Sequence, residues 1–229
     1  MTADAYASAG EVLEDRIRWA TARLRELLVH ARQHGWVEAD PTAPALGGPS
    51  AASLRAAIDE RLAGTGLAVR TLPLEWLRLR LGLAPLELDA LWLLAAIELD
   101  PGVARLAHAF GLDGCPGLSI QLLRRLLPLG FAEIDELARL GLVERTTDHR
   151  IPGHLRFIRA ADRVAELAAG ELRLDPEVAQ IAELVAPTAS TSPGLAMPSD
   201  DALLVATGID GSGRATLLRS LAENRGKGT

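Results

Sequence analysis

Apolar positions recur along the first part of the chain with the spacing of an amphipathic helix. Between residues 9 and 35 they follow one another alternately after four and three positions, at Leu13, Ile17, Ala20, Leu24, Leu27 and Ala31. This heptad spacing predicts one helix that packs through a single stripe, either on its own chain or on a partner helix. Charged residues, Arg16 and Arg18 among them, are predicted to fill the other faces of this helix.

The stretch over residues 36–49 is rich in proline and glycine, which predicts a linker. From residue 50 onward, apolar residues at helical spacing alternate with capping and helix-breaking residues. This pattern predicts short helices over residues 50–63, 73–81, 85–99, 101–110, 119–127, 132–140 and 160–169. Leu, Trp, Ala and Ile fill residues 88–97 almost without a break, so the helix over residues 85–99 should be buried on most sides.

Two stretches of strand character, residues 142–147 and 154–158, flank a turn over residues 148–153. Short helices followed by a two-stranded ribbon are typical of a winged helix-turn-helix. We therefore predict a mainly α fold, in which residues 1–35 form the N-terminal amphipathic helix and residues 50–185 form a helical winged-helix-like domain. A last helix over residues 175–185 ends this domain.

The charges of the predicted domain leave three uses open for its wing. The helix over residues 132–140, which would enter a DNA groove, carries Glu133, Asp135 and Glu136 against one arginine. DNA phosphates repel such an acidic face, which favours a solvated wing or a protein contact over a DNA contact. The basic residues of the wing are Arg145, Arg150, Arg156 and Arg159.

A second stretch of linker composition covers residues 186–199. An apolar run then leads into the glycine-rich sequence GIDGSGRAT at residues 208–216, and a helical pattern follows over residues 217–223. Strand, glycine-rich turn and helix in this order are typical of a phosphate-binding loop, whose backbone N–H groups favour an anion. We therefore predict the start of an incomplete α/β P-loop module over residues 200–229. Its candidate nucleotide-binding residues are Gly208, Gly211, Ser212, Gly213, Arg214 and Thr216.

Two side chains of this loop depart from the usual pattern. Arg214 stands where the motif has lysine, and its guanidinium is a wider, forked group. Ala215 lacks the hydroxyl that would bind Mg²⁺, and Thr216 is turned about 100° away along the helix. The loop therefore predicts weak or lost binding of ATP or ADP, without Mg²⁺. The alternative is a glycine-rich turn in some other αβ unit.

Composition excludes several classes of protein. Lys+Arg 24 against Asp+Glu 30 gives a net charge of −6, which offers no global attraction for nucleic acid or an anionic membrane. The longest strongly apolar stretch, residues 90–97, is far shorter than the roughly 20 residues of a membrane-spanning helix. The one cysteine, Cys115, forms no disulfide within the chain, and no secretory signal is evident, so we expect a cytoplasmic protein.

His30 and His34 lie four residues apart on the predicted first helix, a spacing that can hold a metal ion. No glutamate follows His30 in an HExxH pattern, and no third ligand is evident in the sequence. We therefore expect no metal site there.

Two stretches of the chain resemble a known family. They are RLGLAPLELDALWLLAAIELDPGVARL at residues 80–106 and ELRLDPEVAQIAEL at residues 171–184. Both resemble the N-terminal winged-helix region of bacterial AAA+ ATPases of the kind associated with contractile injection systems. In that family a linker then leads to the first strand and phosphate loop of the ATPase core, and the same order occurs here. The resemblance covers residues 73–223 and implies a degenerate first ATPase module followed by an intact second one.

The sequence thus predicts the N-terminal recognition or assembly region of an AAA+ ATPase-like protein, with a degenerate Walker A loop and no catalytic residues of its own. A protein or other AAA+ subunits are the expected partners, the parent protein is expected to form homo-oligomers, and no membrane is expected. Two alternatives stay open. One is a winged-helix DNA-binding regulator that uses residues 119–158, and the other is a scaffold that forms oligomers through its N-terminal helix.

Overall fold

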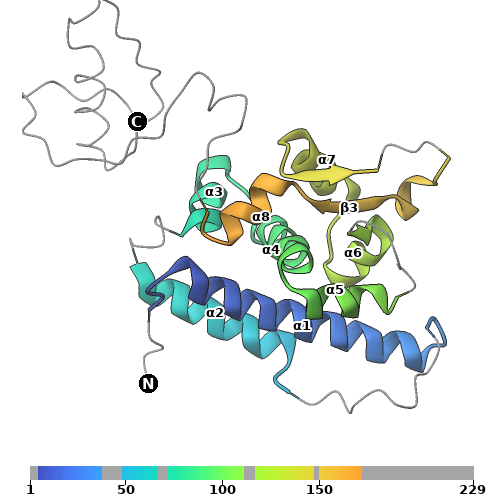
Figure 1. Cartoon of the computed structure of the whole chain (residues 1–229), viewed down its shortest axis with the longest axis horizontal. Coiled ribbons are helices and arrows are strands. Elements are labelled where there is room, and N and C mark those ends of the chain that lie inside the picture. The colour runs from blue at the N-terminus through green and yellow to red at the C-terminus, as the bar shows by residue number, and fades with distance from the viewer. Residues whose placement is uncertain (1–4, 38–47, 67–71, 111–116, 147–149, 172–229) are drawn as a thin grey trace, which may run out of the picture. The chain divides into compact units, whose positions relative to one another are not determined.

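The computed structural model describes residues 5–37, 48–66, 72–110, 117–146 and 150–171, which are mainly α-helical (Figure 1). These residues belong to the unit formed by residues 1–171, while residues 172–229 form a second unit. The predicted helix over residues 175–185, the second linker and the glycine-rich loop lie outside the described residues. Among the helices that are described, none is both long and apolar enough to cross a membrane.

The described elements follow the predicted order closely. The helices are α1 (Ala9–Gln33), α2 (Ala51–Thr65), α3 (Pro73–Leu81), α4 (Pro85–Leu99), α5 (Pro101–His108), α6 (Ile120–Leu126), α7 (Phe131–Arg139) and α8 (Asp162–Ala168). The strands are β1 (Leu118–Ser119), β2 (Val143–Arg145) and β3 (Phe157–Ala160), and the short 3-10 helix η2 (Gly153–Leu155) precedes β3.

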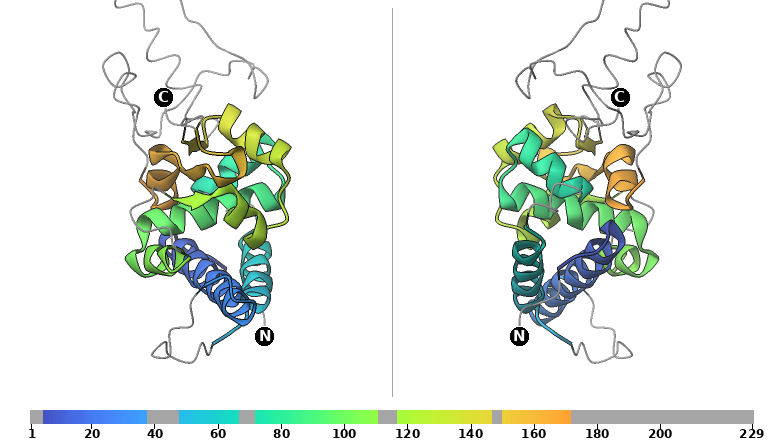
Figure 2. Two further views of the ribbon diagram at one scale, coloured as in Figure 1. Left: turned by 90° about the vertical axis from the view of Figure 1, so that its right-hand side faces the viewer. Right: turned by 90° about the vertical axis from the view of Figure 1, so that its left-hand side faces the viewer.

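Helix α4 forms the centre of the fold, as its apolar sequence predicts. Every residue from Glu87 to Ile97 is buried. Helices α1, α5 and α8 and strand β3 surround it, with smaller contacts from α3 and α7 (Figures 1 and 2). A helix that is apolar on all sides is stable only in such a position, because any exposed side would leave Leu or Ile in water.

Side-chain caps fix where several of these helices begin. The Oδ1 of Asp100 accepts a hydrogen bond from the Val103 N–H at 2.8 Å, and the Oγ of Ser119 accepts one from the Leu122 N–H at 3.2 Å. Each cap satisfies a backbone donor that the first helical turn leaves without a partner. Both caps confirm the predicted starts of α5 and α6.

The predicted end of α2 at residue 63 is wrong by two residues. The helix continues through Gly64 to Thr65, and the chain turns at Gly66, which has a φ of 57°. Thr65 supports this last turn, since its hydroxyl donates to the Arg61 carbonyl at 2.8 Å and accepts from the Tyr6 N–H at 3.0 Å. A positive φ favours glycine, so Gly66 is the residue that lets the chain leave the helix.

The three strands form one antiparallel sheet in the order β1-β3-β2. Strand β1 was not predicted, because Leu118 and Ser119 are too short a run to show an alternating pattern. The return strand is displaced from the predicted residues 154–158, since residues 153–155 form η2 and β3 begins at Phe157. The displacement places Ile158 and Ala160 in the core and leaves Leu155 42% exposed.

Helix α1 packs against its own chain, which is one of the two arrangements that its heptad spacing allowed. Its contacts are with α2, α4, α5 and α6, and Figure 1 shows α1 and α2 side by side below α4. Trp19, Ala20 and Leu24 lie in the core. Leu13, Ile17 and Leu27 are only partly buried, so the buried stripe is displaced from the predicted one toward the neighbouring positions Val12, Arg16, Trp19 and Leu28.

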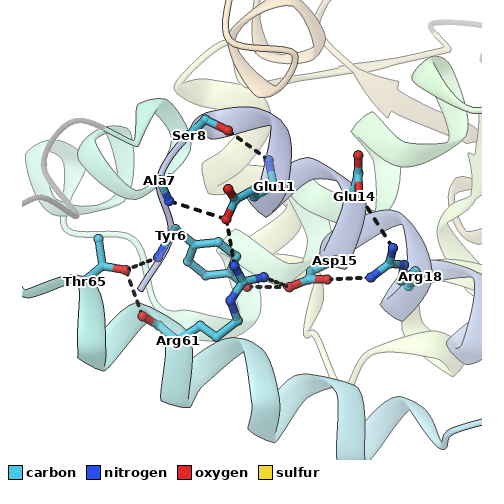
Figure 3. A network of polar contacts seen from close by, with 9 residues as sticks. All are labelled: Tyr6, Ala7, Ser8, Glu11, Glu14, Asp15, Arg18, Arg61 and Thr65. Carbon is cyan, nitrogen blue, oxygen red and sulfur yellow. Dashed lines mark hydrogen bonds and ion pairs between the residues drawn. The ribbon is translucent and has the colours of Figure 1, made fainter. Parts of the chain in front are cut away.

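A polar cluster ties the start of α1 to the end of α2 (Figure 3). Arg61 on α2 pairs with Asp15 at 2.6 Å and with Glu11 at 2.7 Å, and its guanidinium carbon lies 4.0 Å from the centre of the Tyr6 ring. The Tyr6 hydroxyl donates to Asp15 at 3.1 Å. Burial, with the nearby negative charge of Asp15, raises the pKa of Tyr6, so the phenol keeps the proton that it donates.

The prediction that Arg16 lies outside the packed stripe of α1 is wrong. Its side chain is fully buried, and its guanidinium pairs with Asp89 of α4 at 2.9 Å and with Glu75 of α3 at 3.4 Å. Burial lowers the pKa of Arg16, and the two carboxylates oppose this effect. Arg55 of α2 also pairs with Asp89. Four helices therefore meet at one group of buried charges.

Removing Arg16 should destabilise the fold strongly. Arg16→Met is expected to lower the free energy of unfolding by about 1–3 kcal/mol, because Glu75 and Asp89 lose their buried cation and keep only Arg78 and Arg55 as partners. Arg18→Met is the matched control, since Arg18 is 64% exposed and its surface ion pairs contribute about 0–1 kcal/mol. Urea unfolding followed by circular dichroism measures both. Equal losses in the two variants would contradict the assigned role.

Candidate functional site

The wing consists of β2, β3 and the segment between them, and α7 lies directly before it in the chain. Ion pairs hold at least two of the four predicted wing arginines. Arg145 pairs with Asp135 of α7, and Arg159 pairs with Glu144 at 2.6 Å and with Asp162 at 2.7 Å. The sheet register explains the second pair, because Glu144 and Arg159 lie directly opposite each other on β2 and β3.

The other two predicted wing arginines lie near the tip of the wing. Arg156 is partly exposed and donates from its Nε to the Ile151 carbonyl at 3.1 Å. Arg150 is exposed and follows residues 147–149, which lie outside the described residues. The structure therefore brings the four arginines onto one ribbon, but it does not gather them into a single basic patch.

Helix α7 presents an acidic surface, as the sequence predicts. Glu133 and Asp135 are exposed, and Glu136 forms a two-pronged pair with Arg139 at 2.5 and 2.7 Å. The hydrogen bonds from Arg139 lower the pKa of Glu136, which keeps this carboxyl ionised. Since Arg139 is neutralised by Glu136, α7 carries no spare positive charge for a phosphate.

A cavity of about 400 Å³ lies between α6, the first turns of α7 and the wing. Its lining is mixed, with apolar groups beside the Asp135–Arg145 ion pair. The residues around it are Ile120, Phe131, Asp135, Arg145, Thr146, Gly153 and Arg156. Aromatic residues and arginine, both present in this lining, are enriched at surfaces that contact other proteins.

A second set of functional candidates, on α6, was not predicted from the sequence. The guanidinium carbon of Arg124 lies 4.3 Å from the centre of the Phe131 ring, and that of Arg125 lies 4.0 Å from the centre of the Trp36 ring. Phe131 is 46% exposed and Trp36 is 47% exposed. The signal available in the sequence was the Arg124-Arg125 pair itself, but nothing in the sequence placed Trp36 beside it.

His30 and His34 lie together at the end of α1, with ring centres 4.0 Å apart. The Trp36 ring contacts both imidazoles, at 5.0 and 5.5 Å between ring centres. The Nδ1 of His34 lies 2.8 Å from the His30 carbonyl oxygen and donates to it. Among the described residues, no group of three or more His, Cys, Asp and Glu side chains could hold a metal ion.

The candidate nucleotide-binding residues cannot be placed in this geometry. Gly208, Gly211, Ser212, Gly213, Arg214 and Thr216 all lie outside the described residues, as does Cys115. The phosphate-binding loop therefore stays a prediction from the sequence.

Helices α6 and α7 with the β2–β3 ribbon, which β1 extends to a three-stranded sheet, define a winged-helix domain. The family model described as "Winged helix domain, variant" matches residues 2–134. This match covers more than half of the 229 residues, and the chain belongs to that family. Because the match begins before α1, it includes the two N-terminal helices as well as α3 to α6. No curated protein and no solved structure matches the chain.

Removing the carboxylates that pair with the wing arginines should create DNA affinity. In the variant Asp135→Asn with Glu144→Gln, Arg145 loses Asp135 and Arg159 loses one of its two partners. We expect nonspecific binding to a DNA duplex to increase, with a salt slope steeper by about 0.9 for each additional phosphate that the variant neutralises. Fluorescence anisotropy at several salt concentrations measures this.

The control for that experiment is Glu14→Gln with Glu60→Gln, which changes the net charge equally at exposed positions of α1 and α2. An equal rise in affinity in the control would show that overall charge, and not the wing, governs binding. That result would contradict the importance given to the two ion pairs.

Proposed function

We propose that this chain is the protein-recognition and assembly region of a larger AAA+ ATPase-like protein, and that its winged-helix domain contacts protein and not DNA. One observation carries the second half of this proposal. On the surface that a winged helix would turn toward DNA, formed by α7 and the wing, Arg139, Arg145 and Arg159 are all paired with carboxylates.

Phosphate contacts supply most of the affinity of a nonspecific DNA complex, and each one needs an available cation. Arg145 and Arg159 would have to leave Asp135, Glu144 and Asp162 before they could bind phosphate. The exposed carboxylates of Glu133 and Asp135 would also lie near the DNA backbone. Both effects oppose binding to a long polyanion.

Binding to another protein requires fewer available cations than binding to DNA does. Interfaces between proteins are enriched in arginine and aromatic residues, which contribute contact area and directed hydrogen bonds. The surface around α6 and α7 has both, in Arg124, Arg125, Phe131 and Trp36. The apolar stripe of α1 is occupied by helices of its own chain, so the proposal does not depend on oligomers formed through α1.

The ATPase part of the proposal rests on the sequence. The order of winged-helix region, linker, apolar run and glycine-rich loop resembles bacterial AAA+ ATPases of the kind associated with contractile injection systems. In the proposed role the loop at residues 208–216 keeps backbone groups that suit a phosphate, while Arg214 and Ala215 remove the lysine and the Mg²⁺-binding hydroxyl. A nucleotide held here would serve assembly and would not be hydrolysed at this site.

The DNA-binding alternative shares the winged-helix fold and predicts a different response to mutation. If the wing does not contact DNA, Arg150→Ala and Arg156→Ala should change the affinity for a DNA duplex by less than about twofold. Anisotropy titrations at low and moderate salt measure this. Salt-dependent binding that weakens severalfold in either variant would overturn the proposal in favour of a DNA-binding regulator.

Restoring the two missing side chains should restore Mg²⁺-dependent affinity in the loop. Arg214→Lys with Ala215→Thr is expected to bind ATP at least about tenfold more tightly with Mg²⁺ than without it, because the new hydroxyl can ligate the ion. The natural chain should show no such difference in calorimetric titrations. If the restored variant also ignores Mg²⁺, the stretch is not a degenerate phosphate-binding loop.

A further inference from the structure

We infer that the exposed face of α6, with the two aromatic rings beside it, docks an acidic and apolar peptide segment of a partner protein. This docking face consists of Gln121, Arg124, Arg125, Phe131 and Trp36. The inference rests on the proposed role in protein recognition and names the surface and the chemistry of the partner.

The inference starts from Arg124 and Arg125, whose positive charges no carboxylate of the described residues neutralises. Arg124 donates from its Nε to the Leu129 carbonyl at 3.0 Å, and Arg125 contacts the ring of Trp36. Within the described residues neither guanidinium pairs with a carboxylate, in contrast to Arg139, Arg145 and Arg159. An arginine held against a ring is oriented before binding, and its remaining N–H groups suit a carboxylate.

The buried side of α6 holds this helix in place. Ile120, Leu123 and Leu126 are buried, and Arg23 of α1 donates from its Nε to the Leu126 carbonyl at 2.7 Å. The docking face is therefore presented on a rigid element, and little ordering is required when a partner binds.

An apolar hollow adjoins the docking face on the side of Arg125. It has a volume of about 180 Å³ and lies where the ends of α1 and α5 meet α6. Its apolar walls come from Leu27, Ala31, Trp36, Val37, Phe110 and Leu122, and Ser119, Gln121 and Arg125 form its polar rim. The hollow has room for one apolar side chain, and Arg125 at its rim suits a carboxylate next to that side chain.

A peptide fits this surface better than a nucleic acid does. Phe131 is the first residue of α7, and Glu133 and Asp135 follow it on the same helix. A short segment with two or three carboxylates can contact the arginines without reaching these acidic groups. A polynucleotide carries a charge on every phosphate and would run past them at a cost in free energy.

The test measures binding of the full chain to a fluorescein-labelled peptide with the core Glu-Glu-Leu-Phe-Glu. Arg124→Gln with Arg125→Gln should weaken binding by about tenfold or more, since two charge-assisted contacts are lost. The control is Arg18→Gln with Arg139→Gln, which removes the same charge at positions that are 64% and 69% exposed and lie outside the docking face. This control should bind as the natural chain does.

Two further variants separate the rings from the charges. Trp36→Ala and Phe131→Ala should each weaken binding about threefold while the fold is retained, because both rings are half exposed. Peptides with Gln for Glu, or with Ser for Leu and Phe, should lose most of the affinity. Absence of binding by the natural chain, or equal binding by the α6 variant and its control, would overturn the inference.

Failure of the docking inference and failure of the proposed function can be told apart by also measuring binding to a labelled single-stranded oligonucleotide and to a labelled duplex. If a nucleic acid binds and the α6 variant abolishes that binding, the face serves nucleic acid and both proposals fail. If neither the peptide nor a nucleic acid binds, only the docking inference fails. Protein recognition would then have to use another face of the domain.

Discussion

The buried contact between Arg16 and the carboxylates of Asp89 and Glu75 is the constraint on which the arrangement of the helices depends. A carboxylate inside a nearly continuous apolar helix is unfavourable unless a cation lies beside it. Asp89 therefore requires α1 and α2 to bring Arg16 and Arg55 to α4. Hydrophobic burial alone would allow α1 to rotate or slide on α4. The charged contact specifies one register, with α3 held through Glu75.

This constraint also marks where sequence reasoning succeeds and fails. The helices, their caps and the central position of α4 follow from local patterns, because capping residues and apolar periodicity act within one element. The burial of Arg16 does not, since its partners are 59 and 73 residues away along the chain. Strand β1 was missed for a similar reason: two residues become a strand only through pairing with Ile158 and Phe157.

Sequence reasoning also missed the contacts that pair charges within the candidate site. Counting arginines in the sequence gave a basic wing, and the structure shows that Arg145 and Arg159 are neutralised by neighbours on α7, β2 and α8. The adjacent α6 arginines were visible in the sequence, but nothing there showed that they have no carboxylate partner among the described residues. Trp36 reaches Arg125 only because α1 crosses beneath α6. A partner recognises the charges that remain after ion pairs within the chain have formed. The sequence does not show which charges these are, whereas a structure does.

The positions of paired and unpaired charges indicate which surface of this winged-helix domain suits an anionic partner. The fold presents two neighbouring surfaces, the α7–wing surface and the exposed side of α6. In the proposed role, carboxylates on α7 and the wing would oppose phosphate binding by the first surface. They would do so without disturbing the core, because Glu133, Asp135 and Glu144 are all exposed. Arginines beside exposed rings then make the second surface the more suitable one for an anionic group. In the proposed role, these surface charges would be what directs the winged-helix fold to a protein and away from DNA.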